Sequence, residues 1–142
     1  AWLQDNNLLD LKTYGDLRDL INRRADKGEM ISVNETDSLL VAYNRMRASD
    51  VSQIPVMNNN KLMGILDEED LLFAVSKDQS SFSNNVSDYM MDHLDTLQFD
   101  ASKDELLSIL TEGKVAIIYD GETFIGFVTK VDLINYYRNK FN

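Results

Sequence analysis

The chain contains one short sequence pattern twice. In both copies an apolar segment with a glycine leads into a polar residue, and an aspartate follows three positions later. The copies are Leu62–Val75 (LMGILDEEDLLFAV) and Phe124–Tyr136 (FIGFVTKVDLINY). The corresponding positions are Gly64 and Gly126, Asp67 and Thr129, Asp70 and Asp132, and Leu71 and Leu133. An internal repeat of this kind indicates that the fold uses one structural unit twice.

The first copy extends upstream as a β-α-β-β-α unit. The spacing of its apolar residues predicts strands at Met30–Val33, Gln53–Met57 and Leu62–Leu66, and helices around Leu39–Met46 and over Glu68–Val75. Thr36 or Asp37 is the expected cap of the first helix, and Asp67 that of the second. Pro55 lacks an N–H group and is therefore expected at a strand start or a sheet edge. Asn58–Asn60 predicts a tight hairpin turn, because asparagine tolerates positive φ.

The second copy repeats this order of elements. The predicted elements are a strand at Thr96–Phe99, a helix at Ser102–Leu110, strands at Lys114–Tyr119 and Phe124–Val128, and a helix at Lys130–Tyr137. Ser102-x-x-Glu105 is a capping box, and Asp120-Gly121 is a strong hairpin signal. Aligning Ile31 with Leu97 at the first strand gives an offset of 66 residues between the copies. Aligning Gly64 with Gly126 gives an offset of 62. The difference is about one helical turn, so we expect the first helix of the second copy to be one turn shorter.

These patterns predict an α+β fold with four segments. Residues 1–29 are expected to be a lead-in helix or linker from a preceding N-terminal domain, and residues 30–76 are the first repeat. Residues 77–95 are a linker rich in serine and asparagine, closed by a Val86–Met91 cluster that docks on the fold, and residues 96–142 are the second repeat. We expect the lead-in to pack on the first repeat, unless it is only the tail of an interdomain linker. Because each sheet has an apolar face to bury, the repeats are expected to pair sheet to sheet about a pseudo-twofold axis, which creates two related clefts.

Composition argues against several classes of function. The formal net charge of −10 disfavours nucleic-acid and anionic-membrane partners, which require a basic face. The chain has no cysteine and one histidine, His93, which we interpret as a solvated loop residue, so neither thiol chemistry nor a metal site is expected. No apolar run approaches the roughly 20 residues of a membrane span. No nucleophile motif is present, so we predict no catalytic residue and no resident cofactor. We also expect a cytoplasmic location.

Two interpretations of Thr129-x-x-Asp132 follow from the residues. In one, the pair only caps a helix, as S/T-x-x-E does. In the other, the helix N-terminus and the Thr129 hydroxyl bind the polar tail of a ligand. The Asp132 carboxylate then accepts hydrogen bonds from ribose hydroxyls, as acidic residues do in dinucleotide folds. The base would face Gln53 and the backbone of the QIPV strand.

The combination of these features resembles a tandem CBS-domain pair, also called a Bateman module. The double β-α-β-β-α order, QIPV before a hairpin, and the helix starts GILDEEDLL and GFVTKVDLI carry the resemblance, which covers about Met30 to Phe141. Within the family, the segments WLQDNNLL and DLINRRADKGEMISV are similar to the C-terminal regulatory domain of bacterial cystathionine β-synthases. The resemblance implies a homodimer formed through exposed helices. It also implies a module that binds AMP, ADP, ATP or S-adenosylmethionine between its repeats and controls an attached catalytic domain, which in a cystathionine β-synthase carries pyridoxal phosphate.

The resemblance assigns residues to two clefts. One would use Thr129 and Asp132 for the tail and ribose of the ligand, together with Phe127, Val131, Val51, Ser52, Gln53, Ile54, Thr96 and Leu97. The possible second cleft would use Asp67, Asp70, Met30, Ile31, Val115 and Ala116. Asp67 replaces the threonine or serine that is usual in the family, and its carboxylate would repel a phosphate. We therefore expect the second cleft to be empty or to prefer a cationic tail such as that of S-adenosylmethionine, unless Asp67 is only a cap in a degenerate cleft.

Three functions compete on the sequence alone: a sensor of an adenosyl ligand, an enzyme, and a structural dimerisation module with non-binding clefts. The CBS pair of another enzyme or of a transporter is a variant of the sensor. The enzyme lacks a nucleophile–base pair, and helix capping explains the paired carboxylates of Asp67 and Asp70. Ligand binding distinguishes the sensor from the dimerisation module.

Overall fold

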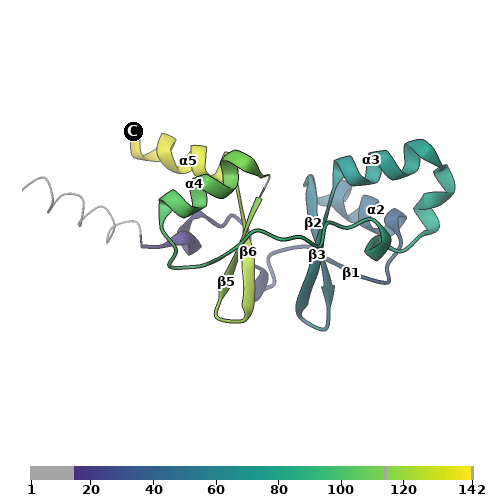
Figure 1. Cartoon of the computed structure of the whole chain (residues 1–142), viewed down its shortest axis with the longest axis horizontal. Helices are drawn as coiled ribbons and strands as arrows, with labels where there is room; N and C mark the ends of the chain where they lie inside the picture. The colour runs from purple at the N-terminus through teal and green to yellow at the C-terminus, as the bar shows by residue number, and fades with distance from the viewer. Residues whose placement is uncertain (1–14, 114, 142) are drawn as a thin grey trace, which may run out of the picture. The chain divides into compact units, whose positions relative to one another are not determined.

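The computed structural model describes residues 15–113 and 115–141, which form two compact units. One unit is built from Met30–Leu94, and the other combines residues 15–29 with residues 95–141. Each unit has its own three-stranded sheet, its own helices and its own core (Figure 1). This arrangement confirms the predicted α+β fold of two β-α-β-β-α repeats, whereas the sheet-to-sheet pairing of the repeats stays a prediction.

The first repeat forms the Met30–Leu94 unit. Its elements are β1 (Val33–Asn34), α2 (Leu39–Ser49), β2 (Gln53–Asn58), β3 (Lys61–Asp67) and α3 (Glu68–Lys77), followed by the 3₁₀ turns η3 (Gln79–Ser83) and η4 (Val86–Asp88). The sheet order is β1-β2-β3, with β1 parallel and β3 antiparallel to β2. Both helices pack on one face of the sheet, and the core between them consists of Val33, Leu39, Ala42, Met46, Ile54, Val56, Leu66, Leu71, Ala74 and Val86.

The second repeat has the same construction. Its elements are the 3₁₀ turns η1 (Leu17–Leu20) and η2 (Ala25–Lys27), then β4 (Thr96–Gln98), α4 (Lys103–Glu112), β5 (Val115–Asp120), β6 (Thr123–Thr129) and α5 (Lys130–Phe141). The sheet order is β4-β5-β6, with β4 parallel and β6 antiparallel to β5. The core contains Leu17, Leu20, Ile21, Leu106, Leu110, Ala116, Ile118, Ile125, Val128 and Leu133.

The strand register corrects the predicted alignment of the two copies. Val33 lies opposite Val56, and Leu97 lies opposite Ile118, the residue at the equivalent place in the second sheet. Leu97 therefore corresponds to Val33 rather than to Ile31, and the offset at the first strand is 64 residues instead of 66. The first helices differ by only one residue, since α2 has 11 and α4 has 10. The prediction of a helix shorter by a full turn is wrong, because the connection before β5 is shorter as well.

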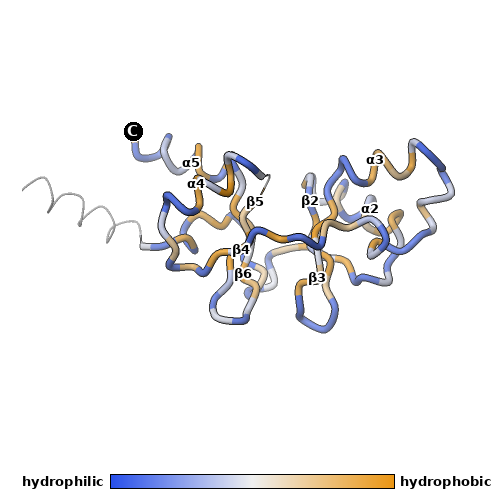
Figure 2. The backbone as a smooth tube through the Cα atoms, viewed as in Figure 1, coloured by the Kyte–Doolittle hydropathy of each residue, from blue (hydrophilic) through white to orange (hydrophobic). Residues whose placement is uncertain are grey.

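The hairpin turns follow from local backbone chemistry. Asn59 and Asn60 adopt φ values of 51° and 69° between β2 and β3, and Gly121 adopts 62° between β5 and β6. These left-handed conformations suit asparagine and glycine, which confirms both predicted turns. Figure 2 shows the polar turn of the β2–β3 hairpin in blue next to mainly apolar strands.

The helix caps agree with the sequence at α4 and differ at α2. Ser102 and Glu105 form the predicted capping box at the start of α4. At α2 the cap is Ser38 rather than Thr36 or Asp37. The carboxylate of Asp37 instead accepts a hydrogen bond from the N–H of Asn34 at 2.8 Å, so it stabilises the turn that precedes the helix.

Pro55 is the third residue of the middle strand, not at a strand start or outer edge as predicted. Its neighbour on β3 is Ile65, whose N–H and C=O groups both bond to Met91 of the linker, at 2.9 and 2.7 Å. The nitrogen of Pro55 therefore points to the β1 side, where β1 begins only at Val33, opposite Val56. Since the strand has no ladder partner at this point among the described residues, the missing N–H group costs no hydrogen bond.

The lead-in packs on the second repeat, which corrects the prediction that it packs on the first. Its buried apolar residues belong to the core of the second repeat and are Leu17, Leu20 and Ile21. Asp16 caps η1, and the guanidinium of Arg18, hydrogen-bonded to this carboxylate, holds the pKa of Asp16 below its ordinary value. The N–H of Leu17 also donates to the carbonyl of Phe99 at 3.0 Å. Residues 1–14 of the predicted lead-in lie outside the described residues.

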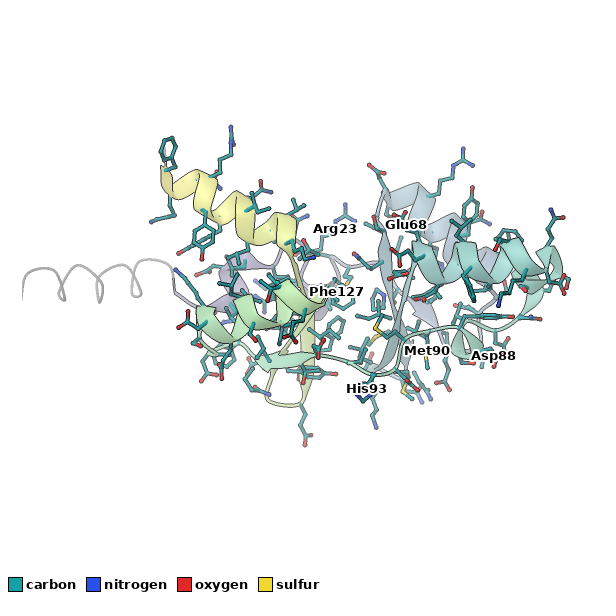
Figure 3. All side chains as sticks on the ribbon, turned by 45° about the horizontal axis from the view of Figure 1, so that its top comes forward. Arg23, Glu68, Asp88, Met90, His93 and Phe127 are labelled. Carbon is teal, nitrogen blue, oxygen red and sulfur yellow. The ribbon has the colours of Figure 1, made fainter. Side chains whose placement is uncertain are left out.

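In each unit a chain segment crosses the glycine of the repeat. A Cβ atom on Gly64 would lie 2.7 Å from both the sulfur of Met90 and the carbonyl oxygen of Met91. A Cβ atom on Gly126 would lie 3.1 Å from the carbonyl oxygen of Arg23. The linker therefore docks on the fold as predicted, and its place is on the first repeat. The lead-in takes the equivalent place on the second repeat, and Figure 3 labels Met90 and Arg23 on these two segments.

Candidate functional site

The end of β6 and the start of α5 hold the predicted Thr129–Asp132 pair. The N–H group and the hydroxyl of Thr129 both donate to Oδ2 of Asp132, at 2.8 and 2.9 Å, and the N–H of Asp132 approaches Oγ1 of Thr129 at 3.3 Å. Within residues 15–113 and 115–141 no donor to the other carboxylate oxygen, Oδ1, is found. The pair is thus a helix cap that leaves half of the carboxylate able to accept hydrogen bonds from a ligand.

A polar groove of about 400 Å³ opens beside Asp132 within the same unit. One wall is formed by residues 19–22 of the lead-in, and the other by the first turns of α5, with Val131, Asp132, Asn135, Tyr136 and Asn139. Asn135 and Asn139 follow Asp132 by three and seven residues and therefore share its side of the helix. Carboxylate and amide groups along one wall can exchange several hydrogen bonds with a polyhydroxylated ligand.

The corresponding pair in the first repeat is Asp67 and Asp70. The N–H of Asp70 donates to Oδ1 of Asp67 at 3.0 Å, and the N–H of Asp67 approaches Oδ2 of Asp70 at 3.4 Å, so this pair also forms a capping box. Asp67 is only 4% exposed. The first helical N–H group, that of Glu68, donates to the carbonyl of Ser52 at 3.0 Å. A buried carboxylate at a helix start offsets the dipole that attracts anions, so this end suits a phosphate less well than the Thr129 end does.

Comparison with known proteins identifies the repeated unit. The family profile described as the CBS domain matches residues 17–77 and 86–139, one match for each repeat. The chain belongs to the CBS-domain family. It is a CBS pair, and CBS domains are a regulatory family.

Solved structures of CBS proteins share the fold. A CBS-domain containing protein from Agrobacterium tumefaciens gives a TM-score of 0.74 at 20% identity, covering 86% of this chain and 98% of that one. A CBS domain-containing protein from Bacillus anthracis gives 0.75 at 19% identity, with coverages of 88% and 94%. The structure of CBSX2 in complex with AMP gives 0.75 at 16% identity, with coverages of 89% and 98%. At these identities the likeness establishes the fold alone, and no curated protein matches the sequence significantly.

The predicted base-side residues lie at the start of the middle strand in each CBS repeat. Gln53 lies opposite Asp67, and Val115 lies opposite Thr129, so each strand start adjoins the helix start of its own repeat. The predicted clefts instead combine residues 51–54 with Thr129, and residues 115–116 with Asp67. Because those pairs come from different units, both assignments stay predictions.

Two of the assigned residues have no accessible side chain. Ile54 and Ala116 are both 0% exposed and belong to the cores of their repeats. Alternate side chains of a strand point to the same face of the sheet. Ile54 and Val56 therefore both face the helices of the first repeat, and Ala116 and Ile118 both face those of the second. Only the backbone groups of Ile54 and Ala116 can therefore contact a ligand.

The remaining assigned residues have different surroundings. Phe127 is buried on β6, with its ring centroid 5.3 Å from that of Phe124, and it lies outside the helix-side core (Figure 3). Val131 is 63% exposed on α5, next to Asp132. The other four lie at the first strand of each repeat: Thr96 and Leu97 in β4, and Met30 and Ile31 before β1.

Sequence reasoning missed the groove beside Asp132. The spacing of Asn135 and Asn139 after Asp132 is a signal that could have indicated a polar wall on α5. No comparable signal places residues 19–22 opposite that wall, because the contact joins parts of the chain more than 100 residues apart.

The described part of the chain shows no candidate metal cluster and no candidate membrane span. His, Asp and Glu residues form no group of three or more there that could hold a metal ion. His93 is exposed. None of the helices in residues 15–113 and 115–141 combines the length and the apolar character needed to cross a membrane.

Proposed function

We propose that the chain is a cytoplasmic regulatory CBS pair that binds an adenosyl ligand, S-adenosylmethionine or an adenine nucleotide, through Thr129 and Asp132. The proposal rests on the position of the Asp132 carboxylate. One of its oxygens, Oδ2, accepts the hydrogen bonds of the helix cap, and the side chain lines a polar groove. Asp132 would accept hydrogen bonds from the ribose hydroxyls, and the helix N-terminus with the Thr129 hydroxyl would face the polar tail. The AMP complex of the structural neighbour CBSX2 supports an adenosine ligand for this fold.

The ligand would act on an attached catalytic domain. The resemblance of the lead-in to bacterial cystathionine β-synthases supports a pyridoxal-phosphate lyase as that domain. This chain would then contribute regulation and no catalytic group, and pyridoxal phosphate would belong to the other domain. The alternatives are a dimerisation module with non-binding clefts, or the CBS pair of another enzyme or a transporter.

The two repeats would differ in what they bind. The second repeat offers a hydroxyl at Thr129 and a lysine, Lys130, next to it, which suits a phosphate or a carboxylate. The first repeat offers the buried carboxylate of Asp67, followed by Glu68 and Glu69. We propose that this end rejects phosphorylated nucleotides and either stays empty or accepts the cationic tail of S-adenosylmethionine.

The chain would act as a homodimer formed through its helices. Several large apolar side chains on the helices of both repeats are exposed: Leu40, Leu72, Phe73, Leu107, Val131, Ile134 and Tyr137. Exposed apolar residues gathered on one side of an element mark surfaces that another protein covers. A dimer provides the two-state element on which a ligand can act, with coupling free energies of about 1–3 kcal/mol in typical allosteric proteins.

Calorimetric titration tests the ligand assignment. The chain and its Asp132→Ala variant are titrated with S-adenosylmethionine, AMP and ATP. We expect one of these ligands to bind the unaltered chain, and its affinity to fall by about 10- to 150-fold in the variant, as expected when a charged hydrogen-bond acceptor is lost. The matched control is Ser102→Ala, which removes a helix cap of the same repeat at a residue outside both predicted clefts.

The control separates binding from stability. If Asp132→Ala and Ser102→Ala weaken the same ligand equally, the loss comes from helix capping and the assignment to Asp132 is wrong. If none of the three ligands binds, the dimerisation module is the better description. Binding of S-adenosylmethionine without binding of ATP would support the cystathionine β-synthase parent.

A further inference from the structure

Arg23 is a half-buried arginine of the lead-in that has no partner in the described part of the chain. The other half-buried cations in residues 15–113 and 115–141 all bind an acidic or hydroxyl group within 3.0 Å, namely Arg18 on Asp16, Arg24 on Asp26 and Lys103 on Tyr136. Removing a charge from water costs free energy unless an opposite charge or a hydrogen-bond acceptor compensates it. The Arg23 guanidinium is therefore available to an anion from outside the chain.

Arg23 crosses the sheet of the second repeat near the end of β6. Its carbonyl oxygen would lie 3.1 Å from a Cβ atom on Gly126, which precedes Thr129 by three residues. Residues 19–22, just before Arg23, form one wall of the polar groove, opposite the first turns of α5. The turn η2, just after it, contacts β6. The lead-in thus runs from the helix start back along β6, and Arg23 lies between the groove and the strand; Figure 3 labels this residue together with Phe127 of β6.

The polar groove needs a cation from outside its lining if it is to hold a phosphorylated ligand. The charged residues among its lining are both acidic, Asp19 and Asp132. Lys130, at the start of α5, is exposed and therefore interacts through water. Arg23 is half-buried, and a guanidinium can bind a phosphate through two parallel hydrogen bonds. Arg23 is thus the better suited of the two cations to fix an anionic tail.

We propose that Arg23 binds the phosphate of an adenine nucleotide whose ribose is held by Asp132. The inference rests on the proposed function and narrows its ligand to adenosyl compounds with an anionic tail. The nucleotide would then contact the second repeat through Asp132 and the lead-in through Arg23, so binding would fasten the lead-in to the repeat. Because the lead-in is the predicted connection to a preceding domain, the nucleotide would restrain that connection.

Calorimetry with AMP and adenosine measures the contribution of the phosphate. The two compounds share the base and the ribose, so the difference in their affinities reports the tail alone. We expect Arg23→Gln to weaken AMP binding by about 10- to 150-fold, as for the loss of a charged hydrogen bond. Adenosine affinity should stay unchanged. The control is Lys27→Gln, which removes the same charge from an exposed residue of the lead-in and should leave AMP binding unchanged.

Arg23→Lys separates charge from packing. Lysine keeps the positive charge but lacks the planar fork of the guanidinium, so its AMP affinity should lie between those of the unaltered chain and Arg23→Gln. An AMP loss in Arg23→Lys as large as in Arg23→Gln would overturn the proposal. So would a parallel loss of adenosine binding in Arg23→Gln, or an equal loss of AMP binding in Lys27→Gln, because the effect would then come from the fold or from the overall charge.

Hydrogen exchange tests whether the nucleotide fastens the lead-in. Saturating AMP should slow the exchange of the amides of residues 17–22 in the unaltered chain, and saturating adenosine should slow it less. In Arg23→Gln, AMP at saturation should protect these amides no better than adenosine does. Full protection by AMP in this variant would contradict the proposal.

These measurements distinguish failure of the inference from failure of the proposed function. If S-adenosylmethionine binds and AMP does not, or if AMP and adenosine bind equally tightly, the adenosyl ligand is kept and the role of Arg23 is refuted. If adenosine, AMP and S-adenosylmethionine all fail to bind, the proposed function is refuted, and the inference is refuted with it.

Discussion

The residue that begins each final helix is the sharpest difference between the two repeats. Thr129 presents a hydroxyl that donates to Asp132, while Asp67 presents a carboxylate that accepts from the N–H of Asp70. Both residues satisfy the helix start, so both repeats fold in the same way. The helix start of the second repeat, however, has a neutral residue where the first repeat has a carboxylate. The positive end of the helix dipole is therefore not offset at that position in the second repeat. Ligand preference can therefore differ while the backbone stays the same.

Exchanging that residue should change the ligand preference of the first repeat. In Asp67→Thr the cap is kept and the negative charge is removed, so we expect AMP or ATP to bind the first repeat at least about tenfold more tightly, given the strength of charge repulsion at a few ångströms. Calorimetric stoichiometry measures this as a second equivalent of nucleotide. The matched variant Thr129→Asp should lose nucleotide affinity at the second repeat. If neither exchange alters stoichiometry or affinity, the helix-start residue does not select the ligand.

Gly64 is required by the linker that crosses it. A Cβ atom there would meet the sulfur of Met90 and the carbonyl oxygen of Met91, both at 2.7 Å. We expect Gly64→Ala to lower the free energy of unfolding by about 1–3 kcal/mol, the usual cost of overpacking, as measured by urea denaturation. The control is Gly113→Ala, where the nearest atom is 3.2 Å away and a smaller loss is expected. Met90→Ala should not rescue Gly64→Ala fully, because the Met91 carbonyl belongs to the backbone.

At the scale of elements, the lead-in is a structural part of the second repeat. Leu17 is 3% exposed in the core of that repeat, so Leu17→Ala should cost about 2–5 kcal/mol. Hydrogen exchange should then accelerate in β4, β5 and β6 and remain unchanged in β1, β2 and β3. Lys61→Ala, at an exposed residue of the first repeat, is the control and should have little effect. Equal acceleration in both sheets would show that the two units unfold as one.

The sequence predicts elements better than it predicts their partners. Strands, helices and hairpins are encoded locally: Asn59, Asn60 and Gly121 set the turns, and Ser102 with Glu105 sets a helix start. The partner of the lead-in is not encoded locally, because apolar residues at helical spacing fit the core of either copy equally well. The alignment of the first strands failed for a similar reason, since the register of β1 depends on hydrogen bonds to β2 and not on its own two residues.

The candidate site also has a part that the sequence predicts and a part that it does not. Thr129 and Asp132 could be predicted because a strand, a cap and a helix start are consecutive in the chain, and the structure joins them by hydrogen bonds. The groove beside them could not, since one wall comes from residues 19–22. Nor could burial be read from the repeat pattern: Ile54 and Ala116 match the cleft positions by sequence, yet both side chains face their own cores.

At the scale of the whole molecule, one helix connects the ligand site with the proposed dimer contact. Helix α5 carries Asp132 on the side of the polar groove, and it carries the exposed apolar residues Ile134 and Tyr137 outside the groove. A rigid helix cannot shift on one side without shifting on the other, so the adenosyl ligand and the partner copy should influence each other's binding. Thermodynamic linkage requires the two effects to be equal in size.

We therefore expect the ligand to change the dimer dissociation constant by about 5- to 150-fold, the usual range for allosteric coupling. Dimerisation should change the ligand dissociation constant by the same factor. Sedimentation equilibrium at zero and saturating ligand measures the first effect, and ligand titrations well below and well above the dimer dissociation constant measure the second. The variant Ile134→Lys, which places a charge among the exposed apolar residues of α5 and leaves both predicted clefts intact, should bind ligand as the monomer does at every concentration. A ligand affinity that is independent of chain concentration in the unaltered protein would mean that α5 transmits nothing, and that regulation passes instead through the lead-in wall of the groove.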